Sequence, residues 1–247
     1  MNYGLKLWSK NYNSLNSAKE LIESGIFHYI ELMVIPDSDI SLFSKVKLPY
    51  IVHIPHEDFG LNLADKEKEE FSLKIINQSI KWADKLSAKY LILHTGFGEI
   101  KTAQNFLKKI NDKRILIENE PKVGTNDEKM IGYAPKQVKS LAGNKFGFCL
   151  DFGHAIKAAL SQGIDYKQYI KQFLRLNPKV FHISDGMLKT GKDEHLNIGE
   201  GEYDFKFLLS CIKNNGSKLV TLETPRNNLN SFKEDLENVR TLRRFAP

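Results

Sequence analysis

The sequence predicts a (β/α)₈ barrel, a TIM barrel of the α/β class, formed by residues 1–247 as a single domain. Two observations carry this prediction. Short runs rich in Val, Ile, Leu and Tyr alternate with longer segments of helical periodicity along the whole chain. The alternation occurs eight times, and 247 residues is the usual size of such a barrel. No linker rich in Pro, Gly or Ser interrupts the pattern.

Eight runs have the length and composition of buried parallel strands. In chain order they span residues 4–8, 29–34, 50–55, 90–95, 114–119, 147–152, 180–185 and 218–223. An open, doubly wound sheet is the main alternative, but no strand is followed by the GxGxxG turn of a dinucleotide site. The closed barrel is therefore the better prediction.

The segments between the strands have the period of amphipathic helices. The clearest is residues 66–86, and another such segment closes the chain. In the first segment, one apolar face is formed by Phe71, Ile75, Ile76, Ile80 and Ala83. In the second segment, one apolar face is formed by Phe232, Leu236, Val239 and Leu242. We expect both faces to pack against the barrel.

The composition is that of a globular protein, with 41% hydrophobic and 27% charged residues. The apolar runs are too short to span a bilayer, and the N-terminal MNYGLKLWSKNYN lacks the pattern of a signal peptide. Cys149 and Cys211 cannot build a disulfide framework, so we expect buried free thiols. These features predict a cytoplasmic protein without a membrane partner, and we expect a monomer.

The net charge of +6 favours a polyanionic partner, either nucleic acid or a phosphorylated small molecule. The lysines are scattered over helix-like segments rather than gathered in one block. Solvated helix faces explain that distribution equally well. The charge alone therefore does not choose a partner.

Ionisable side chains follow six of the predicted strands, at the barrel face where the active sites of TIM barrels lie. From the third strand to the eighth they are His56, His94, Glu118, Asp151, His154, His182, Asp193, His195 and Glu223. Burying so much charge costs several kcal/mol per group unless cations neutralise it. The nitrogen and oxygen donors suit zinc, manganese or iron. His28 and His53, by contrast, are expected to be ordinary packing residues.

The stretch DEHLNIGEGEYDF follows the seventh strand and contributes two of these groups. Asp193 and His195 are two residues apart on an extended segment, so their side chains can point to the same side. His154, from the neighbouring loop, can complete a three-ligand metal site. Gly199 and Gly201 then allow the backbone to pass close to that site before the next helix begins near Asp204.

The motifs LDFGHA, DEHLNIGEG and LETP resemble those of the endonuclease IV family, the metal-dependent apurinic/apyrimidinic endonucleases of the xylose isomerase-like barrel superfamily. The resemblance extends over residues 50–225. It implies up to three Zn²⁺ ions, with Mn²⁺ or iron also possible, and hydrolysis of DNA at abasic sites. The implied ligands are His56, His94 and Glu118 for the first ion; Glu118, Asp151, His182 and Glu223 for the second; and His154, Asp193 and His195 for the third.

In this resemblance Glu118 is the catalytic carboxylate, because it bridges the first two ions and orients the attacking water between them. The chain differs from the family in the loops that bind DNA. The loop after the second strand, IPDSDISL, is short and acidic, and the family's wedge positions resemble Phe59 and Gly60. Phosphodiester hydrolysis is therefore better supported than duplex recognition.

A sugar or sugar-phosphate isomerase or epimerase of the same superfamily is the alternative. Such enzymes resemble this chain at Glu118, Asp151, His182 and Glu223, which would bind a single Mn²⁺ or Mg²⁺, and at Glu31 in YIELM. The partner would then be a small phosphorylated sugar rather than DNA. This alternative leaves His56, His94 and the group around Asp193 without a role, so we favour the multi-metal hydrolase.

Overall fold

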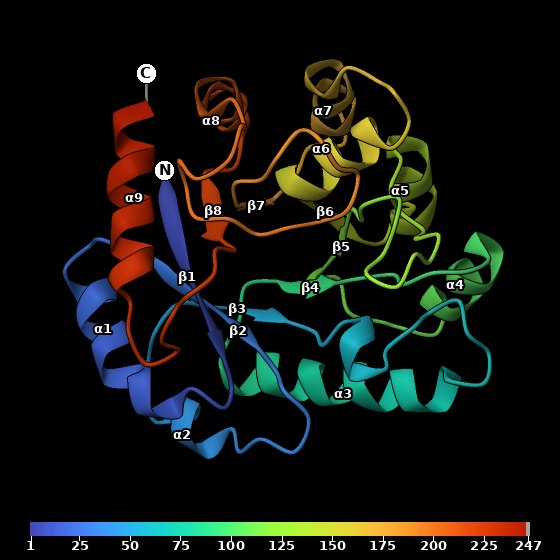
Figure 1. Ribbon diagram of the computed structural model, residues 1–247. Helices are drawn as coiled ribbons and strands as arrows, with labels where there is room; N and C mark the ends of the chain where they lie inside the picture. The colour runs from blue at the N-terminus through green and yellow to red at the C-terminus, as the bar shows by residue number, and fades with distance from the viewer. Residues whose placement is uncertain (246–247) are drawn as a thin grey trace.

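The structure is a computed structural model and describes residues 1–245 (Figure 1). Within this range eight parallel strands close into a barrel, in which each strand pairs with its neighbours in the sequence and β8 pairs with β1. The strands are β1 (Asn2–Trp8), β2 (Tyr29–Met33), β3 (Tyr50–His53), β4 (Leu91–Leu93), β5 (Ile115–Glu118), β6 (Gly147–Asp151), β7 (Val180–Ile183) and β8 (Leu219–Leu222). Each of them overlaps a predicted strand, so the predicted (β/α)₈ barrel is confirmed.

Helices cover the outside of the strands (Figure 1). The α-helices are α1 (Leu15–Glu23), α2 (Ser41–Ser44), α3 (Glu69–Lys85), α4 (Ile100–Leu107), α5 (Pro135–Ala142), α6 (Phe152–Leu160), α7 (Tyr166–Leu174), α8 (Phe205–Lys213) and α9 (Lys233–Phe245). Two short 3₁₀ helices, η1 (Tyr12–Ser14) and η2 (Glu57–Phe59), lie in the loops after β1 and β3. These loops open on the face where the strands end.

The strand residues alternate between the helix-covered outside and the barrel interior. Outward side chains join the large core between strands and helices. Inside the barrel a separate apolar layer is formed by Tyr29, Ile51, Ile92, Leu116, Cys149 and Val180. Two positions further along the same strands stand Glu31, His53, His94, Glu118, Asp151 and His182. The two-residue period therefore places a layer of ionisable groups directly above an apolar floor.

The predicted apolar face of the long helix is confirmed in part. Ile75, Ile76 and Ala83 are buried and Ile80 packs at the edge of the core. The prediction is wrong for Phe71, whose side chain is 47% exposed. Phe71 lies in the first turn of α3, and its ring lies against Gly60 in the loop after β3. The helix begins beyond the edge of the barrel, so this turn covers a loop instead of the core.

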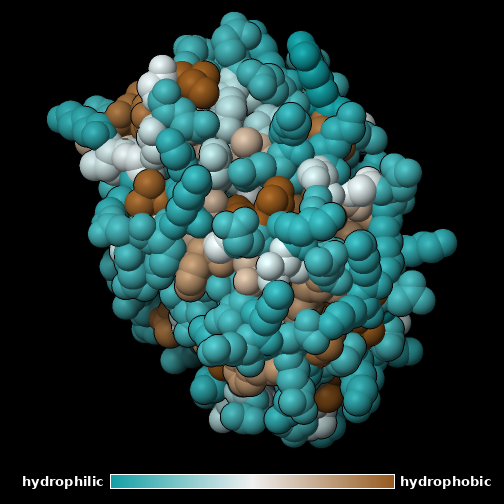
Figure 2. Space-filling model, turned by 90° about the vertical axis from the view of Figure 1, so that its right-hand side faces the viewer, coloured by the Kyte–Doolittle hydropathy of each residue, from teal (hydrophilic) through white to brown (hydrophobic). Residues whose placement is uncertain are grey.

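The outer surface is largely hydrophilic. Figure 2 shows the side of the molecule that lies at the right in Figure 1, where charged and polar residues surround small groups of apolar ones. Such scattered apolar groups are normal on a protein surface. None of the helices described between residues 1 and 245 is long and apolar enough to cross a bilayer.

Candidate metal centre

Several groups of potential ligands meet at the ends of the strands, and the ligand atoms of each group lie within 4.8 Å of one another; three of these groups together contain most of the predicted site residues. We name them by position. The central cluster contains Glu118, Asp151, His182 and Glu223; the outer cluster contains His154, Asp193 and His195; and the side cluster contains His53, His94 and Glu118. Eight of the nine sequence-predicted site residues therefore belong to these clusters, and His56 lies beside the side cluster.

The central cluster brings three carboxylates around one imidazole. His182 Nδ1 lies 3.0 Å from Glu118 Oε1 and 3.2 Å from Glu223 Oε1. The side chains of His182 and Glu118 are fully buried, and that of Glu223 is nearly so. Negative charge thus exceeds positive charge within this cluster, a condition that favours a cation.

Asp151 has two tasks in the central cluster. Its Oδ1 accepts a hydrogen bond from the His154 amide at 2.6 Å, which caps the N-terminus of α6. Its Oδ2 is buried and has no hydrogen-bond partner among the described residues. Burial raises the pKa of Asp151 to about 6, although the nearby His154 opposes the shift. A buried, unpartnered carboxylate oxygen requires an explanation, and a bound cation supplies one.

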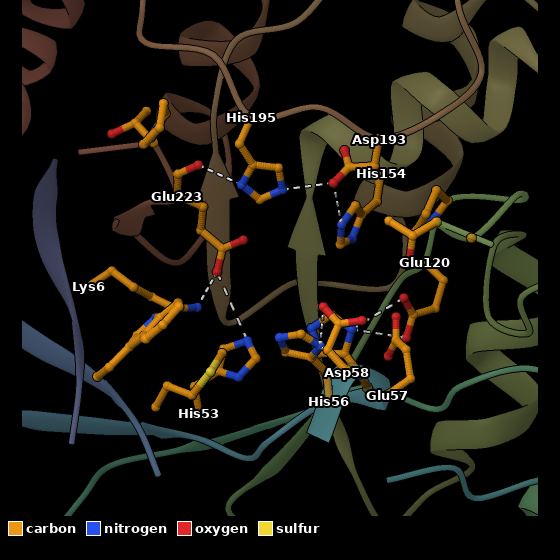
Figure 3. Close-up of a pocket in the computed structure, with 18 of the residues that line it drawn as sticks. Lys6, His53, His56, Glu57, Asp58, Glu120, His154, Asp193, His195 and Glu223 are labelled. Atoms are coloured by element: carbon orange, nitrogen blue, oxygen red, sulfur yellow. Dashed lines mark hydrogen bonds and ion pairs between the residues drawn. The ribbon is translucent and has the colours of Figure 1, made fainter. Parts of the chain in front are cut away.

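The outer cluster joins α6 to the long loop after β7 (Figure 3). Asp193 Oδ2 lies 2.8 Å from His195 Nε2 and 3.6 Å from His154 Nε2. The second oxygen, Asp193 Oδ1, is buried without a hydrogen-bond partner in the described chain. The predicted same-side arrangement of Asp193 and His195 is confirmed, and His154 faces them as expected.

The side cluster contains a residue that sequence reasoning missed. His53, expected to be a packing residue, is buried with its Nε2 3.6 Å from Glu118 Oε2 and 4.0 Å from Glu223 Oε1. His94 Nε2 approaches the same Glu118 oxygen at 3.0 Å. The sequence feature that could have identified His53 is its position two residues after the inward-facing Ile51, because residues two apart on a strand point to the same side.

Five imidazoles share one arrangement: a protein oxygen anchors one ring nitrogen, and the other ring nitrogen faces a carboxylate of one of the clusters. The anchors of His53, His154 and His195 are the carbonyl oxygens of Ile54 at 3.0 Å, Asn119 at 2.8 Å and Glu223 at 2.7 Å. The anchors of His94 and His182 are the carboxylates of Glu120 at 3.1 Å and Glu31 at 3.0 Å. A carbonyl oxygen only accepts, so the anchored nitrogen carries the hydrogen and the inward one can bind a metal.

His56 differs from these five. Its ring lies on the pocket wall, with its centroid 5.6 Å from that of His94, and its Nδ1 accepts a hydrogen bond from the Asp58 amide at 3.4 Å. Burial and the neighbouring His94 lower the pKa of His56 to about 3. The imidazole is therefore neutral, the state that a metal ligand requires.

Two anchors hold the long loop between β7 and α8 and thereby position the outer cluster. The Asp185 carboxylate accepts hydrogen bonds from the amides of Gly199 and Gly201, both at 2.9 Å. The ammonium of Lys157, on the buried face of α6, contacts Glu194 Oε1 at 2.6 Å and the Met187 carbonyl at 2.7 Å. The polar contacts of Asp185 and Lys157 therefore fix the backbone of the loop on both sides of Asp193.

The outer cluster, His53, His94 and Glu223 line a pocket of about 430 Å³ at the mouth of the barrel, whereas Glu118, Asp151 and His182 are fully buried and do not line it (Figure 3). Lys6, Met33 and Arg226 also contribute to its wall. Two large apolar side chains, Trp8 and Leu229, stand at this wall with 43% and 48% of their surface exposed. The bottom of the pocket is therefore charged, and solvent-exposed apolar side chains lie on its wall.

A family model described as Xylose isomerase-like TIM barrel matches residues 41–244. The chain belongs to the xylose isomerase-like TIM barrel family. One relative is the Probable endonuclease 4 of Mycoplasma capricolum subsp. capricolum, which is 30% identical over 201 residues that cover 73% of this chain and 67% of the relative. The predicted resemblance to endonuclease IV is therefore confirmed.

Solved structures of the family share the fold over nearly the whole chain. The endonuclease IV of Thermus thermophilus superposes with a TM-score of 0.70 at 19% identity, covering 99% of this chain and 98% of that one. A D-tagatose 3-epimerase-like protein superposes with a TM-score of 0.75 at 20% identity, covering 99% and 97%. At such identities these xylose isomerase-like barrels agree in fold alone.

The outer cluster should bind metal in exchange for protons. In the metal-free protein burial lowers the pKa of His195, but Asp193 outweighs this effect and the net value is about 9. Burial also opposes protonation of His154, yet Asp151 and Asp193 raise its pKa well above the usual value. Zn²⁺ binding at pH 7 should therefore release protons, and the apparent affinity should fall as the pH is lowered from about 9 towards 6.

Calorimetric titration in buffers of different ionisation enthalpy measures the released protons directly. His195→Ala should release about one proton fewer at this cluster, because one protonated ligand is gone. An affinity that stays constant between pH 6 and pH 9 would contradict the protonated state assigned to the outer cluster.

Gly201→Ala should disrupt the loop that carries the outer cluster. A Cβ atom at this position would lie 2.4 Å from Asp185 Oδ1 and 2.6 Å from the backbone of Gly186, so the loop must move away from its anchor. We expect a loss of about 1–3 kcal/mol in the free energy of unfolding, measured with urea, and weaker metal binding at the outer cluster. Gly216→Ala is the matched control, because a Cβ atom there meets nothing within 4 Å. Equal effects of the two substitutions would refute the anchoring role of Asp185.

Proposed function

We propose that this protein is a metal-dependent phosphodiester hydrolase that cleaves DNA at apurinic/apyrimidinic sites. One observation carries the proposal: the outer cluster lies directly beside the central and side clusters, with His154 Nδ1 3.6 Å from Glu118 Oε1. An isomerase with a single metal ion needs the central cluster alone. Curated relatives named Probable endonuclease 4 support the hydrolase as the more specific assignment.

The residues present fit divalent metal ions. The donors are imidazole nitrogens and carboxylate oxygens, which suit zinc and also manganese or iron. Three buried carboxylate oxygens, Glu118 Oε2, Asp151 Oδ2 and Asp193 Oδ1, lack hydrogen-bond partners within the described chain, and the anchored imidazoles direct their second nitrogen inwards. We assign His56, His94 and Glu118 to a first ion; Glu118, Asp151, His182 and Glu223 to a second; and His154, Asp193 and His195 to a third.

Ions bound at these positions would polarise phosphate oxygens and acidify a water molecule. The residues of the chain supply the geometry. Glu118 directs Oε1 towards His182 and Oε2 towards His94, both at 3.0 Å, so one carboxylate serves the central and side clusters together. We assign it the bridging, catalytic role for this reason. The outer cluster lies next to Glu118, with His154 Nδ1 3.6 Å from Glu118 Oε1, and would help to hold the phosphate there.

The size of the pocket bears on how DNA would be bound. The ligand groups are recessed in a pocket of about 430 Å³, which is large enough for one sugar phosphate. The abasic nucleotide would therefore enter after leaving the helical stack, which is least costly where no base is present to unstack. The short, acidic loop after β2 provides few additional contacts to a DNA duplex.

A sugar or sugar-phosphate epimerase is the second candidate, and two observations favour it. The pocket is large enough for a monosaccharide, and the buried Glu31 lies next to His182 inside the barrel. Metal content separates the two candidates. About three metal ions per purified chain support the hydrolase, whereas about one ion supports the epimerase.

His195→Ala should lower the rate of cleavage of an abasic-site oligonucleotide by about 100-fold or more, because the outer cluster then loses the charge that stabilises the transition state. Binding of the oligonucleotide should weaken less. The exposed His28, in the turn before β2, provides the matched control His28→Ala. If fully metal-loaded wild-type protein leaves abasic DNA intact but interconverts a ketose and its epimer, the hydrolase proposal fails.

Glu118→Gln should remove metal from two clusters at once while leaving the fold intact, since the side chain keeps its shape. We expect the metal content, measured by mass spectrometry of the purified protein, to fall from about three ions towards one. Glu70→Gln, an exposed glutamate in the first turn of α3, should change nothing. Unchanged metal content and activity in Glu118→Gln would eliminate the bridging role.

A further inference from the structure

A buried polar network lies beneath the central cluster and is centred on Glu31 of β2. The Glu31 side chain is fully buried, and both of its oxygens have partners. Oε1 accepts a hydrogen bond from Lys6 Nζ at 2.8 Å. Oε2 accepts one from Thr221 Oγ1 at 2.6 Å and lies 3.0 Å from His182 Nε2. The Thr221 hydroxyl is held in turn by Tyr29, at 2.9 Å. Side chains from three other strands, β1, β7 and β8, therefore contact the carboxylate of Glu31.

This network determines which nitrogen of His182 faces the central cluster. Nε2 points at Glu31, whose oxygen already accepts a hydrogen bond and can only accept another. The hydrogen of the neutral ring is thus kept on Nε2, and Nδ1 is left to face Glu118 and Glu223. Partners of this kind fix the tautomer and the orientation of metal-binding imidazoles in proteins.

Lys6 adds a permanent positive charge at the same place. Its ammonium contacts both Glu31 and Glu223, and its side chain is only 15% exposed. The ligand atoms of Glu31, His53, His182 and Glu223 also lie within 4.8 Å of one another, and Lys6 contacts two of these four residues. In this part of the barrel the ammonium group of Lys6 therefore supplies the positive charge. Because the ammonium engages Glu223 Oε1, it competes with any ion that this oxygen would bind.

We propose that Glu31 and Lys6 are a pair of positioning residues that set the metal affinity of the central cluster in opposite directions. Glu31 strengthens binding by holding His182 in the tautomer that presents Nδ1. Lys6 weakens it by repelling the ion and engaging Glu223, and in the metal-free protein it neutralises carboxylates that would otherwise repel one another. The inference rests on the metal centre of the proposed function but not on the identity of the substrate.

The test compares Zn²⁺ affinities of metal-free variants, measured by competition with a chromophoric chelator. All variants carry His154→Ala and His195→Ala, which remove the outer cluster. Glu31→Gln should weaken binding at the central cluster by about 10–100-fold, the range seen when such a partner of a ligand is lost. Lys6→Met should tighten binding at the same cluster. A purely structural role for the pair would instead lower affinity in both variants or in neither.

Glu120→Gln is the matched control for Glu31→Gln. Glu120 anchors His94 at 3.1 Å as Glu31 anchors His182, so its loss should affect the side cluster and leave the central cluster unchanged. If Lys6→Met does not fold without metal, the double variant Lys6→Met/Glu31→Gln removes both members of the Lys6–Glu31 ion pair, so Glu31 is not left as a buried charge without its lysine. It should bind Zn²⁺ more tightly than Glu31→Gln alone.

A second readout concerns the imidazole itself. Nitrogen NMR of the zinc-loaded protein with labelled histidine should show His182 with its hydrogen on Nε2, and Glu31→Gln should reduce this preference. Opposite shifts of affinity together with this signal support the pair. Equal or absent shifts overturn it, as does a wild-type protein that binds no Zn²⁺. If the shifts occur but abasic DNA is not cleaved, the proposed function fails and the role of the pair stands.

Discussion

The structure depends on one electrostatic constraint, which is the burial of several carboxylates inside a closed barrel. Glu31, Glu118 and Asp151 are fully buried, and Glu223 is nearly so. Charges at such depth are stable only when opposite charges and hydrogen bonds surround them closely. Lys6 and the inward imidazoles provide part of that compensation. The oxygens of Asp151 and Asp193 that lack partners in the described chain mark where it is incomplete.

The backbone pattern explains why these groups can gather without disturbing the barrel. Six interior ionisable residues each follow an apolar residue by two positions, as Glu118 follows Leu116 and His182 follows Val180. The apolar layer closes the barrel below, and the packed interface between strands and helices is untouched. A substitution in the charged layer therefore changes the site more than the fold.

Much of this arrangement could be predicted from the sequence. The strands and the residues at their ends follow from local patterns, and so do the neighbours Asp193 and His195. His53 was missed because the predicted strand, residues 50–55, ran past it, whereas β3 ends at His53. Lys6 was missed because it lies inside β1, before the end of the strand. Phe71 was misplaced because helical periodicity does not show where a helix extends past the barrel. The anchors Asp185 and Lys157 act over long distances in the sequence, which no local pattern reveals.

The arrangement also indicates where chemistries diverge on this barrel. The central cluster is built from side chains on the strands or directly after them, so it belongs to the barrel itself. The outer cluster depends on a loop held by Asp185 and Lys157, and His56 belongs to another loop. Loops change without altering the strands beneath them. A site built on the strands can therefore gain or lose ligands through its loops. In this chain the anchored loop after β7 carries Asp193 and His195, so the multi-metal function that we propose depends on this loop.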